Sequence, residues 1–116
     1  MSKLVIVIDD SASMLTVMKH MIESFHHICI LFRHPDEALR TIPHTKPDLI
    51  ICDYMMFDMD GLQVINTLRG LGVHCQMILY SALYDPDVPE KCLLDGISFF
   101  PKPIKNETLK LILDKL

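Results

Sequence analysis

Residues 4–10 read LVIVIDD, a run of five apolar residues that ends in two aspartates. An unbroken apolar run of this length is typical of a β-strand that is buried on both faces of a parallel sheet. Similar runs recur at Ile28–Phe32, Leu49–Cys52, Met77–Tyr80 and Ile97–Phe100. The sequence therefore predicts five buried strands.

Segments with helical spacing separate these strands. Apolar stripes at Met14, Met18, Met21 and Ile22, and at Leu62, Ile65 and Leu68, predict two helices. Three more are expected at Pro35–Ile42, Asp87–Leu94 and Asn106–Leu116. We expect Pro35 and Pro89 in first helical turns, where the missing N–H is tolerated, and Gly96 at the end of the fourth helix.

Strand and helix alternate along the whole chain, which favours a parallel sheet with helices on both faces. We predict an α/β fold with a single doubly wound five-stranded sheet in the flavodoxin-like order 2-1-3-4-5. The 116 residues suffice for one domain, residues 1–116. Ligands of such sheets bind at the carboxyl ends of the strands, where the strand order reverses.

Composition excludes several classes of function. The net charge is −4 and the Lys and Arg residues are scattered, so direct binding to nucleic acid is not expected. No apolar stretch approaches the length of a membrane span, and the start does not resemble a signal peptide, so a cytoplasmic protein is expected. The four cysteines are far apart, as are the histidines apart from one adjacent pair, which indicates reduced core thiols and no zinc site.

The groups capable of chemistry follow the predicted strands directly. They are Asp9, Asp10, Asp53, Ser81 and Lys102. The carboxyl ends of parallel strands share one edge of the sheet, so these side chains are expected to gather there.

Three converging carboxylates repel one another, and a divalent cation offsets that cost most readily. Oxygen ligands without His or Cys favour Mg²⁺, with Mn²⁺ or Ca²⁺ as weaker candidates, and Mg²⁺ readily shares phosphate oxygens. Lys102 would bind one phosphoryl oxygen and the Ser81 hydroxyl another. Asp53, at the end of the central strand, is the best placed nucleophile for an aspartyl phosphate.

Each of these residues also has an ordinary structural interpretation. A single aspartate after a strand is usually a turn former or helix cap, and Asp10 followed by Ser11 could be only that. Asp58 and Asp60 fit the turn and N-terminal cap of the third helix, so we assign them no chemistry. The combination at four strand ends is much more specific than any one residue.

The chain resembles the receiver domain of two-component response regulators, the CheY-like family, over essentially its whole length. The motifs that carry the resemblance are Ile8-Asp9-Asp10-Ser11, Asp53-Tyr54-Met55-Met56 leading into Met59-Asp60-Gly61, Ser81-Ala82 and Lys102-Pro103.

The resemblance implies a role for each matching residue. Asp53 would be the phosphoacceptor, Asp10 and Asp53 would bind Mg²⁺ directly, and Asp9 would reach it through water. The backbone carbonyl of Met55 would complete the protein ligands. Lys102 would bind the phosphoryl group, and the Lys102–Pro103 peptide bond is expected to be cis.

The family also implies a switch and its partners. Ser81 would move toward the phosphoryl group while Phe99 turns inward, and Phe99, having no hydroxyl, is expected to favour the inward position. The donor would be a sensor histidine kinase or a phosphotransfer protein. The fourth helix, fifth strand and fifth helix would form the face that contacts an effector domain, a target protein or a second copy in a homodimer. The chain would catalyse its own phosphorylation, but as a signalling switch rather than a conventional enzyme.

Several positions depart from the family pattern. Phe57 stands where proline is frequent, and Pro101 removes a backbone donor next to the site. Residues 85–89 (DPDVP) predict a stiff, short fourth helix, a departure within the usual readout face. Met55 and Leu83, each two residues after a site residue, are apolar and cannot orient an attacking water. We therefore predict a comparatively long-lived aspartyl phosphate.

Three other functions would require different features or fewer of them. A flavodoxin-like cofactor module needs an anion-binding loop where this chain has Asp9 and Asp10. A haloacid dehalogenase-like hydrolase needs an Asp-x-Asp pair after the first strand, whereas the pair here is adjacent. A receiver-like interaction module that is not regulated by phosphorylation remains open, although the complete acid cluster does not favour it.

Overall fold

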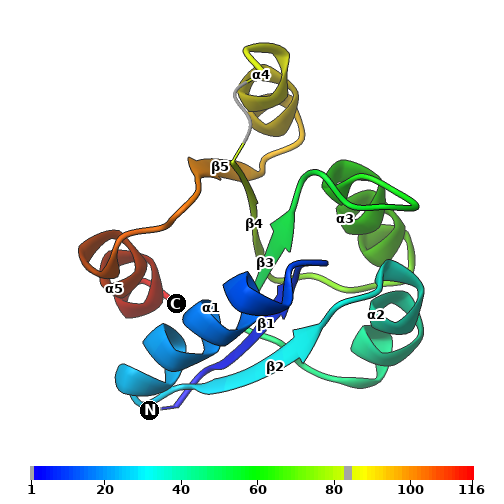
Figure 1. Cartoon of the computed structure of the whole chain (residues 1–116). Coiled ribbons are helices and arrows are strands. Elements are labelled where there is room, and N and C mark those ends of the chain that lie inside the picture. Colours follow the sequence, from blue (N-terminus) through cyan, green and yellow to red (C-terminus); the bar gives the residue numbers. More distant parts are fainter. Residues whose placement is uncertain (1, 83–84) are drawn as a thin grey trace.

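The computed structural model describes residues 2–82 and 85–116 as a five-stranded parallel sheet in the order β2-β1-β3-β4-β5 (Figure 1). The strands are β1 (Leu4–Ile8), β2 (Ile28–Phe32), β3 (Leu49–Asp53), β4 (Gln76–Ser81) and β5 (Ser98–Pro101). The helices are α1 (Ala12–Ser24), α2 (Pro35–Thr41), α3 (Gly61–Gly70), α4 (Asp87–Leu94) and α5 (Asn106–Asp114), and a 3₁₀ turn, η1 (Ile42–His44), follows α2. The predicted doubly wound, flavodoxin-like order is confirmed.

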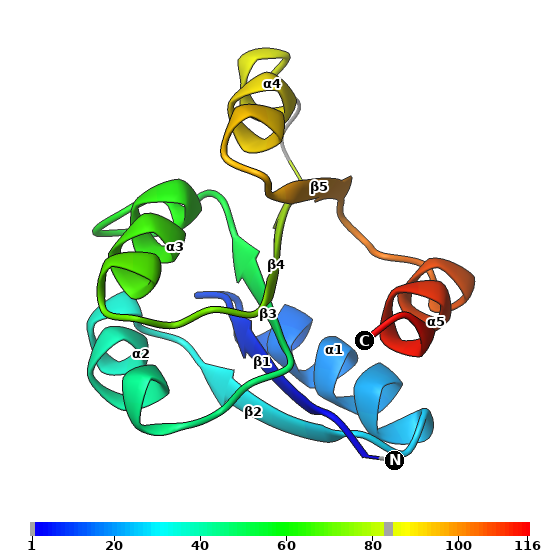
Figure 2. The same cartoon turned by 180° about the vertical axis from the view of Figure 1, so that it is seen from behind.

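Helices cover both faces of the sheet, so the core has two halves (Figures 1 and 2). The half between the sheet and helices α1 and α5 contains Met18 of α1, Ile51 of β3 and Leu109 of α5. The other half, between the sheet and helices α2, α3 and α4, contains Ile65 and Cys92. Each inner strand therefore points alternate side chains into two separate apolar layers.

The strand positions follow from the apolar runs. All residues of β3 are buried, and β1 becomes fully buried from Val5 onward, as expected for strands with a neighbour on either side and helices above and below. β3 extends one residue beyond its apolar run, to Asp53, which pairs with Tyr80 of β4. The phosphoacceptor candidate is thus part of the sheet itself rather than of a loop.

The expectation that every strand is buried on both faces was wrong for β2. Ile28 is 57% exposed and Ile30 is also exposed, while Cys29 and Phe32 are buried. β2 lies at the edge of the sheet, and the part of its face that carries Ile28 and Ile30 meets solvent, up to the buried Phe32. β5, at the opposite edge, is likewise only partly buried.

Helix ends follow the local signals. Asp60 caps α3 in a capping box with Gln63, as its assignment to a cap predicted. α4 spans Asp87–Leu94 as predicted, with Pro89 in its first turn, and Gly96 follows it with a φ of +70°. α2 ends at Thr41 and α5 at Asp114, both before the predicted ends, because η1 and a final turn take over the last residues.

Two further expectations concern the chain as a whole. The cysteines are free, and Cys29, Cys52 and Cys92 are buried while Cys75 is partly buried. Burial raises the pKa of Cys29 and of Cys75 to about 11, so these thiols stay protonated.

Among the described residues, no helix combines the length and the apolar character needed to cross a membrane.

Candidate functional site

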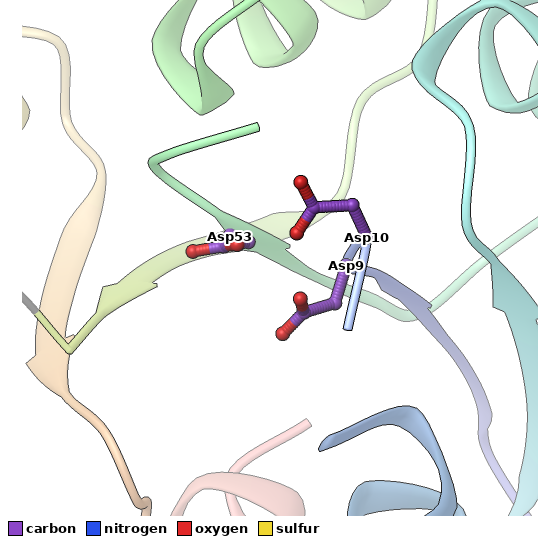
Figure 3. A group of neighbouring side chains, drawn as sticks. All are labelled: Asp9, Asp10 and Asp53. Carbon is purple, nitrogen blue, oxygen red and sulfur yellow. The ribbon is translucent and has the colours of Figure 1, made fainter. Parts of the chain in front are cut away.

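The candidate site lies at the carboxyl edge of the sheet, where β1 and β3 end side by side. Ile8 pairs with Cys52, so the residues that follow, Asp9 and Asp53, emerge next to each other. Figure 3 shows the side chains of Asp9, Asp10 and Asp53 at these two strand ends. Each offers a carboxylate oxygen, and these oxygens lie within 4.8 Å of one another. This is the switch point of the sheet, between strands whose connections run in opposite directions.

Asp9 is fully buried and hydrogen-bonded on both oxygens. Its Oδ1 accepts the backbone N–H of Ser11 at 2.9 Å. Its Oδ2 accepts the Lys102 ammonium at 2.8 Å and the Tyr80 hydroxyl at 2.6 Å. These bonds offset the cost of placing a carboxylate at zero exposure.

Asp10, in contrast, is exposed, and it does not cap the first helix. The N-cap of α1 is Ser11, whose hydroxyl accepts the backbone N–H of Met14. The interpretation of Asp10 as a simple cap is therefore wrong. Its carboxylate is left facing the other two acids and open to solvent.

Lys102 brings the positive charge to the site. Its ammonium lies 2.8 Å from Asp9 Oδ2 and 3.3 Å from Asp53 Oδ1, and only a tenth of the side chain is exposed. The Lys102–Pro103 peptide bond is cis. Pro101 lies at the exposed outer edge of β5, and the Lys102 N–H still donates to the Ser81 carbonyl, so the proline removes no bond to β4.

The pKa of the Asp53 carboxyl is raised from 3.8 to about 6. Burial is the main cause, and the charge of Asp9 adds to it, whereas Lys102 acts in the opposite direction. Asp53 therefore loses its proton near neutral pH in the absence of a cation. A cation at this position would favour the ionised form.

The other predicted site residues differ in how deeply they are buried. Ser81 ends β4 and is buried, beside the Asp53–Tyr80 pair. The Met55 side chain is half exposed in the loop after β3. Phe99 is partly buried and packs against the core half below α2, α3 and α4. Leu83 lies outside the described residues.

Tyr80 belongs to the site, and our sequence analysis missed it. Its position at the end of an apolar run predicts only a core residue, yet its hydroxyl reaches Asp9 and its ring centroid lies 4.6 Å from the Lys102 ammonium. Burial and the hydrogen bond to Asp9 raise the pKa of Tyr80 well above its ordinary value, so the phenol keeps its proton. The signal was available, because a tyrosine in a buried aliphatic strand needs a partner for its hydroxyl.

Gly61 allows the close approach of α3 to the site. A Cβ at this position would overlap the backbone carbonyl of Asp53 and the side chain of Leu79. We expect Gly61→Ala to lower the free energy of unfolding by about 1–3 kcal/mol, because backbone at the end of β3 would have to move. Urea denaturation checks this value.

Gly70, at the other end of the same helix, provides the matched control. A Cβ there meets nothing within 4 Å. Gly70→Ala is expected to leave stability unchanged or raise it by up to about 1 kcal/mol. Equal effects of the two substitutions would contradict the steric role of Gly61.

Fold and site together define a doubly wound α/β domain with an acidic site and one lysine at the carboxyl edge of its sheet. The chain belongs to the response regulator receiver domain family, whose model matches residues 5–114. It is thus a receiver domain homologous to the response regulators of two-component systems. Phosphorylation and Mg²⁺ binding at an acidic pocket are typical of this family.

Curated relatives support the assignment. The chain is 30% identical over 108 residues to the DNA-binding transcriptional regulator NtrC of Proteus hauseri, a match that covers 91% of this chain and 23% of NtrC. It is 35% identical over 69 residues to the regulatory protein PhoP of Bacillus subtilis, covering 60% of this chain and 29% of PhoP. The chain thus spans less than a third of the length of either relative.

Solved structures show the same fold. The signal receiver domain of a putative Luxo repressor protein from Vibrio parahaemolyticus superposes with a TM-score of 0.89 at 23% identity, covering 99% of this chain and 89% of that one. The chemotaxis protein CheY4 of Vibrio cholerae gives 0.86 at 20% identity, covering 99% and 98%.

Proposed function

We propose that Asp53 is the phosphoacceptor of this receiver domain. The observation that carries the proposal is the meeting of the Asp53 carboxylate with the Lys102 ammonium and two further carboxylates at the switch point. A carboxylate nucleophile next to a fixed cation and a site for a second cation is what transfer of an anionic phosphoryl group requires.

Mg²⁺ fits the donor set, and Mn²⁺ could substitute for it. All three acidic side chains offer oxygen, the ligand type that hard cations prefer. Asp10 is open to solvent and would bind the ion directly together with Asp53 and the Met55 carbonyl. The oxygens of Asp9 already accept three hydrogen bonds, which supports its contact through water. The bound ion would neutralise charge on the carboxylates and the phosphoryl oxygens.

In the proposed reaction, an oxygen of ionised Asp53 attacks the phosphorus atom of a phosphohistidine. The P–N bond breaks, its electron pair goes to the imidazole nitrogen, and an acyl phosphate forms on Asp53. Lys102 and the Ser81 hydroxyl hold phosphoryl oxygens during the transfer. Since the donor comes from a partner, the chain acts as a switch that catalyses its own modification.

The signal would pass through Ser81 and Phe99. Movement of the Ser81 side chain toward the phosphoryl group opens space beside β5, and Phe99 already packs partly against the core on that side. The phosphoryl group shifts the population toward the arrangement that binds it better.

Partners are part of the same proposal. A sensor histidine kinase or a phosphotransfer protein would supply the phosphoryl group, and an effector domain or target protein would read the face of α4, β5 and α5. Leu93 and Leu94 of α4 are each 80% exposed, and Leu111 of α5 is 62% exposed. Exposed leucines of this kind suit a protein contact, including a homodimer, better than direct contact with nucleic acid. We also propose that the protein is cytoplasmic, as expected from the sequence.

Incubation with acetyl phosphate and Mg²⁺, followed by mass spectrometry, tests the proposal. The wild-type chain is expected to gain one phosphoryl group and Asp53→Asn none. Absence of labelling in the wild type would favour the alternative, a receiver-like interaction module without phosphorylation.

Met55 is expected to prolong the life of the aspartyl phosphate. Its apolar side chain, half exposed beside the site, cannot orient a water toward phosphorus. Met55→Asn introduces such a group and is expected to increase the rate of dephosphorylation by about tenfold, less than the roughly hundredfold or more of a positioned general acid or base, because an amide orients water without taking its proton. The decay of labelled protein after removal of the donor measures the rate. A wild-type half-life of seconds would contradict the prediction.

A further inference from the structure

Tyr80 is a buried polar residue of the site to which the proposed chemistry gives no role. It lies on β4 at zero exposure and belongs to the core half between the sheet and helices α1 and α5, together with Val7, Ile51 and Ile104. Its hydroxyl donates to Asp9 Oδ2 at 2.6 Å, and its ring lies beneath the Lys102 ammonium. One residue thus contacts both the buried acid and the cation of the site.

Within residues 2–82 and 85–116, Asp9 Oδ2 accepts hydrogen bonds from Tyr80 and Lys102, and of these two donors Lys102 also contacts a second carboxylate, that of Asp53. The Lys102 ammonium is 2.8 Å from Asp9 and 3.3 Å from Asp53. In the proposed reaction Lys102 binds a phosphoryl oxygen on Asp53. It must then give up much of its contact with Asp9, whose fully buried carboxylate would lose the charge of that donor.

We propose that Tyr80 is a positioning residue that keeps Asp9 hydrogen-bonded while Lys102 moves from Asp9 to the phosphoryl group. The tyrosine hydroxyl stays on Oδ2 in both states, so the release of Lys102 never leaves that oxygen without a donor. The face of the Tyr80 ring attracts the Lys102 ammonium by a cation–π interaction. This contact can be kept while the ammonium shifts from Asp9 toward the phosphoryl group. Tyr80 thereby lowers the free-energy cost of the phosphorylated state relative to the resting one.

This inference rests on the proposed phosphorylation of Asp53. It predicts an effect on the phosphorylated state that exceeds any effect on Mg²⁺ binding to the resting state. In the resting protein without the hydroxyl, Lys102 still satisfies Asp9 Oδ2. With a phosphoryl group present, neither protein donor remains on Asp9 Oδ2, so the free-energy cost of losing the hydroxyl is larger in this state than in the resting one.

Tyr80→Phe is the decisive substitution because it keeps the ring and removes only the hydroxyl. The probes are Mg²⁺ alone and Mg²⁺ with beryllofluoride, which occupies the position of a phosphoryl group on a carboxylate. We expect the affinity for beryllofluoride at saturating Mg²⁺ to fall about tenfold or more, the effect of losing one hydrogen bond to a buried charge. The affinity for Mg²⁺ alone is expected to change by less than about threefold, since Lys102 still serves Asp9.

Tyr54→Phe is the matched control. Tyr54 follows Asp53 directly, and its hydroxyl makes no hydrogen bond to the residues at 2–82 and 85–116. Loss of this hydroxyl is expected to leave both affinities unchanged. Circular dichroism of each variant verifies that the fold is retained, and acetyl phosphate labelling rates should rank the variants as beryllofluoride does.

The outcomes separate the inference from the proposed function. Beryllofluoride affinity that is equal in the wild type and Tyr80→Phe overturns the role of Tyr80. Parallel losses of Mg²⁺ and beryllofluoride affinity also overturn it, since they would place Tyr80 in the metal site alone. A Tyr80→Phe variant that fails to fold would overturn it too, because the hydroxyl would then be needed in the resting state. A wild-type chain that binds no beryllofluoride and takes no label refutes the proposed function itself.

Discussion

Asp53→Asn is expected to eliminate the phosphoryl mass that the wild-type chain gains from acetyl phosphate and Mg²⁺. The amide has nearly the same shape as the carboxylate but lacks an anionic oxygen that can attack phosphorus. Asp53 lies in the central strand β3 and is 4% exposed, so the substitution changes the reacting atoms with little change in packing. A complete loss of labelling is the largest effect that any single substitution in this chain should produce.

Asp58→Asn makes the same chemical change five positions further along the chain and serves as control. Asp58 is exposed, lies in the connection that follows Asp53 between β3 and α3, and has no assigned chemistry. It should label at the wild-type rate. Persistent labelling of Asp53→Asn, or equal losses in both variants, would show that the phosphoryl group attaches elsewhere or that the loop rather than Asp53 matters.

The same substitution is expected to stabilise the metal-free protein above pH 6. The pKa of Asp53 is raised to about 6 in the folded chain, from 3.8, mainly by burial and then by Asp9. A raised carboxyl pKa means that the folded state holds a proton that the unfolded state releases, so stability falls as pH rises from about 4 through 6. The wild-type chain then loses about 2–3 kcal/mol of stability that the uncharged asparagine variant keeps.

Urea denaturation without divalent cations at pH 8 and pH 4 measures this difference. The variant should be more stable by about 2–3 kcal/mol at pH 8, and the two proteins should converge at pH 4, where Asp53 is largely protonated in the folded state. Adding Mg²⁺ at pH 8 should stabilise the wild type more than the variant, since a bound cation offsets the repulsion. A variant that is less stable than the wild type at pH 8 would show that the Lys102 contact outweighs burial.

Much of the fold was predictable because its signals are local. The apolar runs at Leu4–Ile8 and Ile28–Phe32 match β1 and β2 residue for residue, and α4 has the predicted bounds. The capping role of Asp60 was equally readable, because a cap depends on a few adjacent residues. The error at β2 has a different origin. Whether a strand lies at the edge of the sheet depends on the order of all five strands, and this order cannot be read from a single apolar run.

The candidate site divides in the same way. The positions of Asp9, Asp10, Asp53 and Lys102 after apolar runs predicted that their side chains would meet, since a parallel sheet places all carboxyl ends at one edge. The different exposure of Asp9 and Asp10, adjacent in the chain, was not predictable from the pattern. Successive side chains point in opposite directions, and only the packing around them decides which is buried.

By itself, the sequence determined the alternation of strand and helix and the set of groups at the carboxyl edge, because periodicity and strand ends are properties of short segments. Only the tertiary structure decided how those groups share their contacts. It placed Lys102 between Asp9 and Asp53 and brought the Tyr80 hydroxyl, 71 residues away in the chain, to Asp9. The physical reason is that a buried carboxylate must find donors wherever the folded chain provides them, and these donors come from strands that are neighbours only in the assembled sheet.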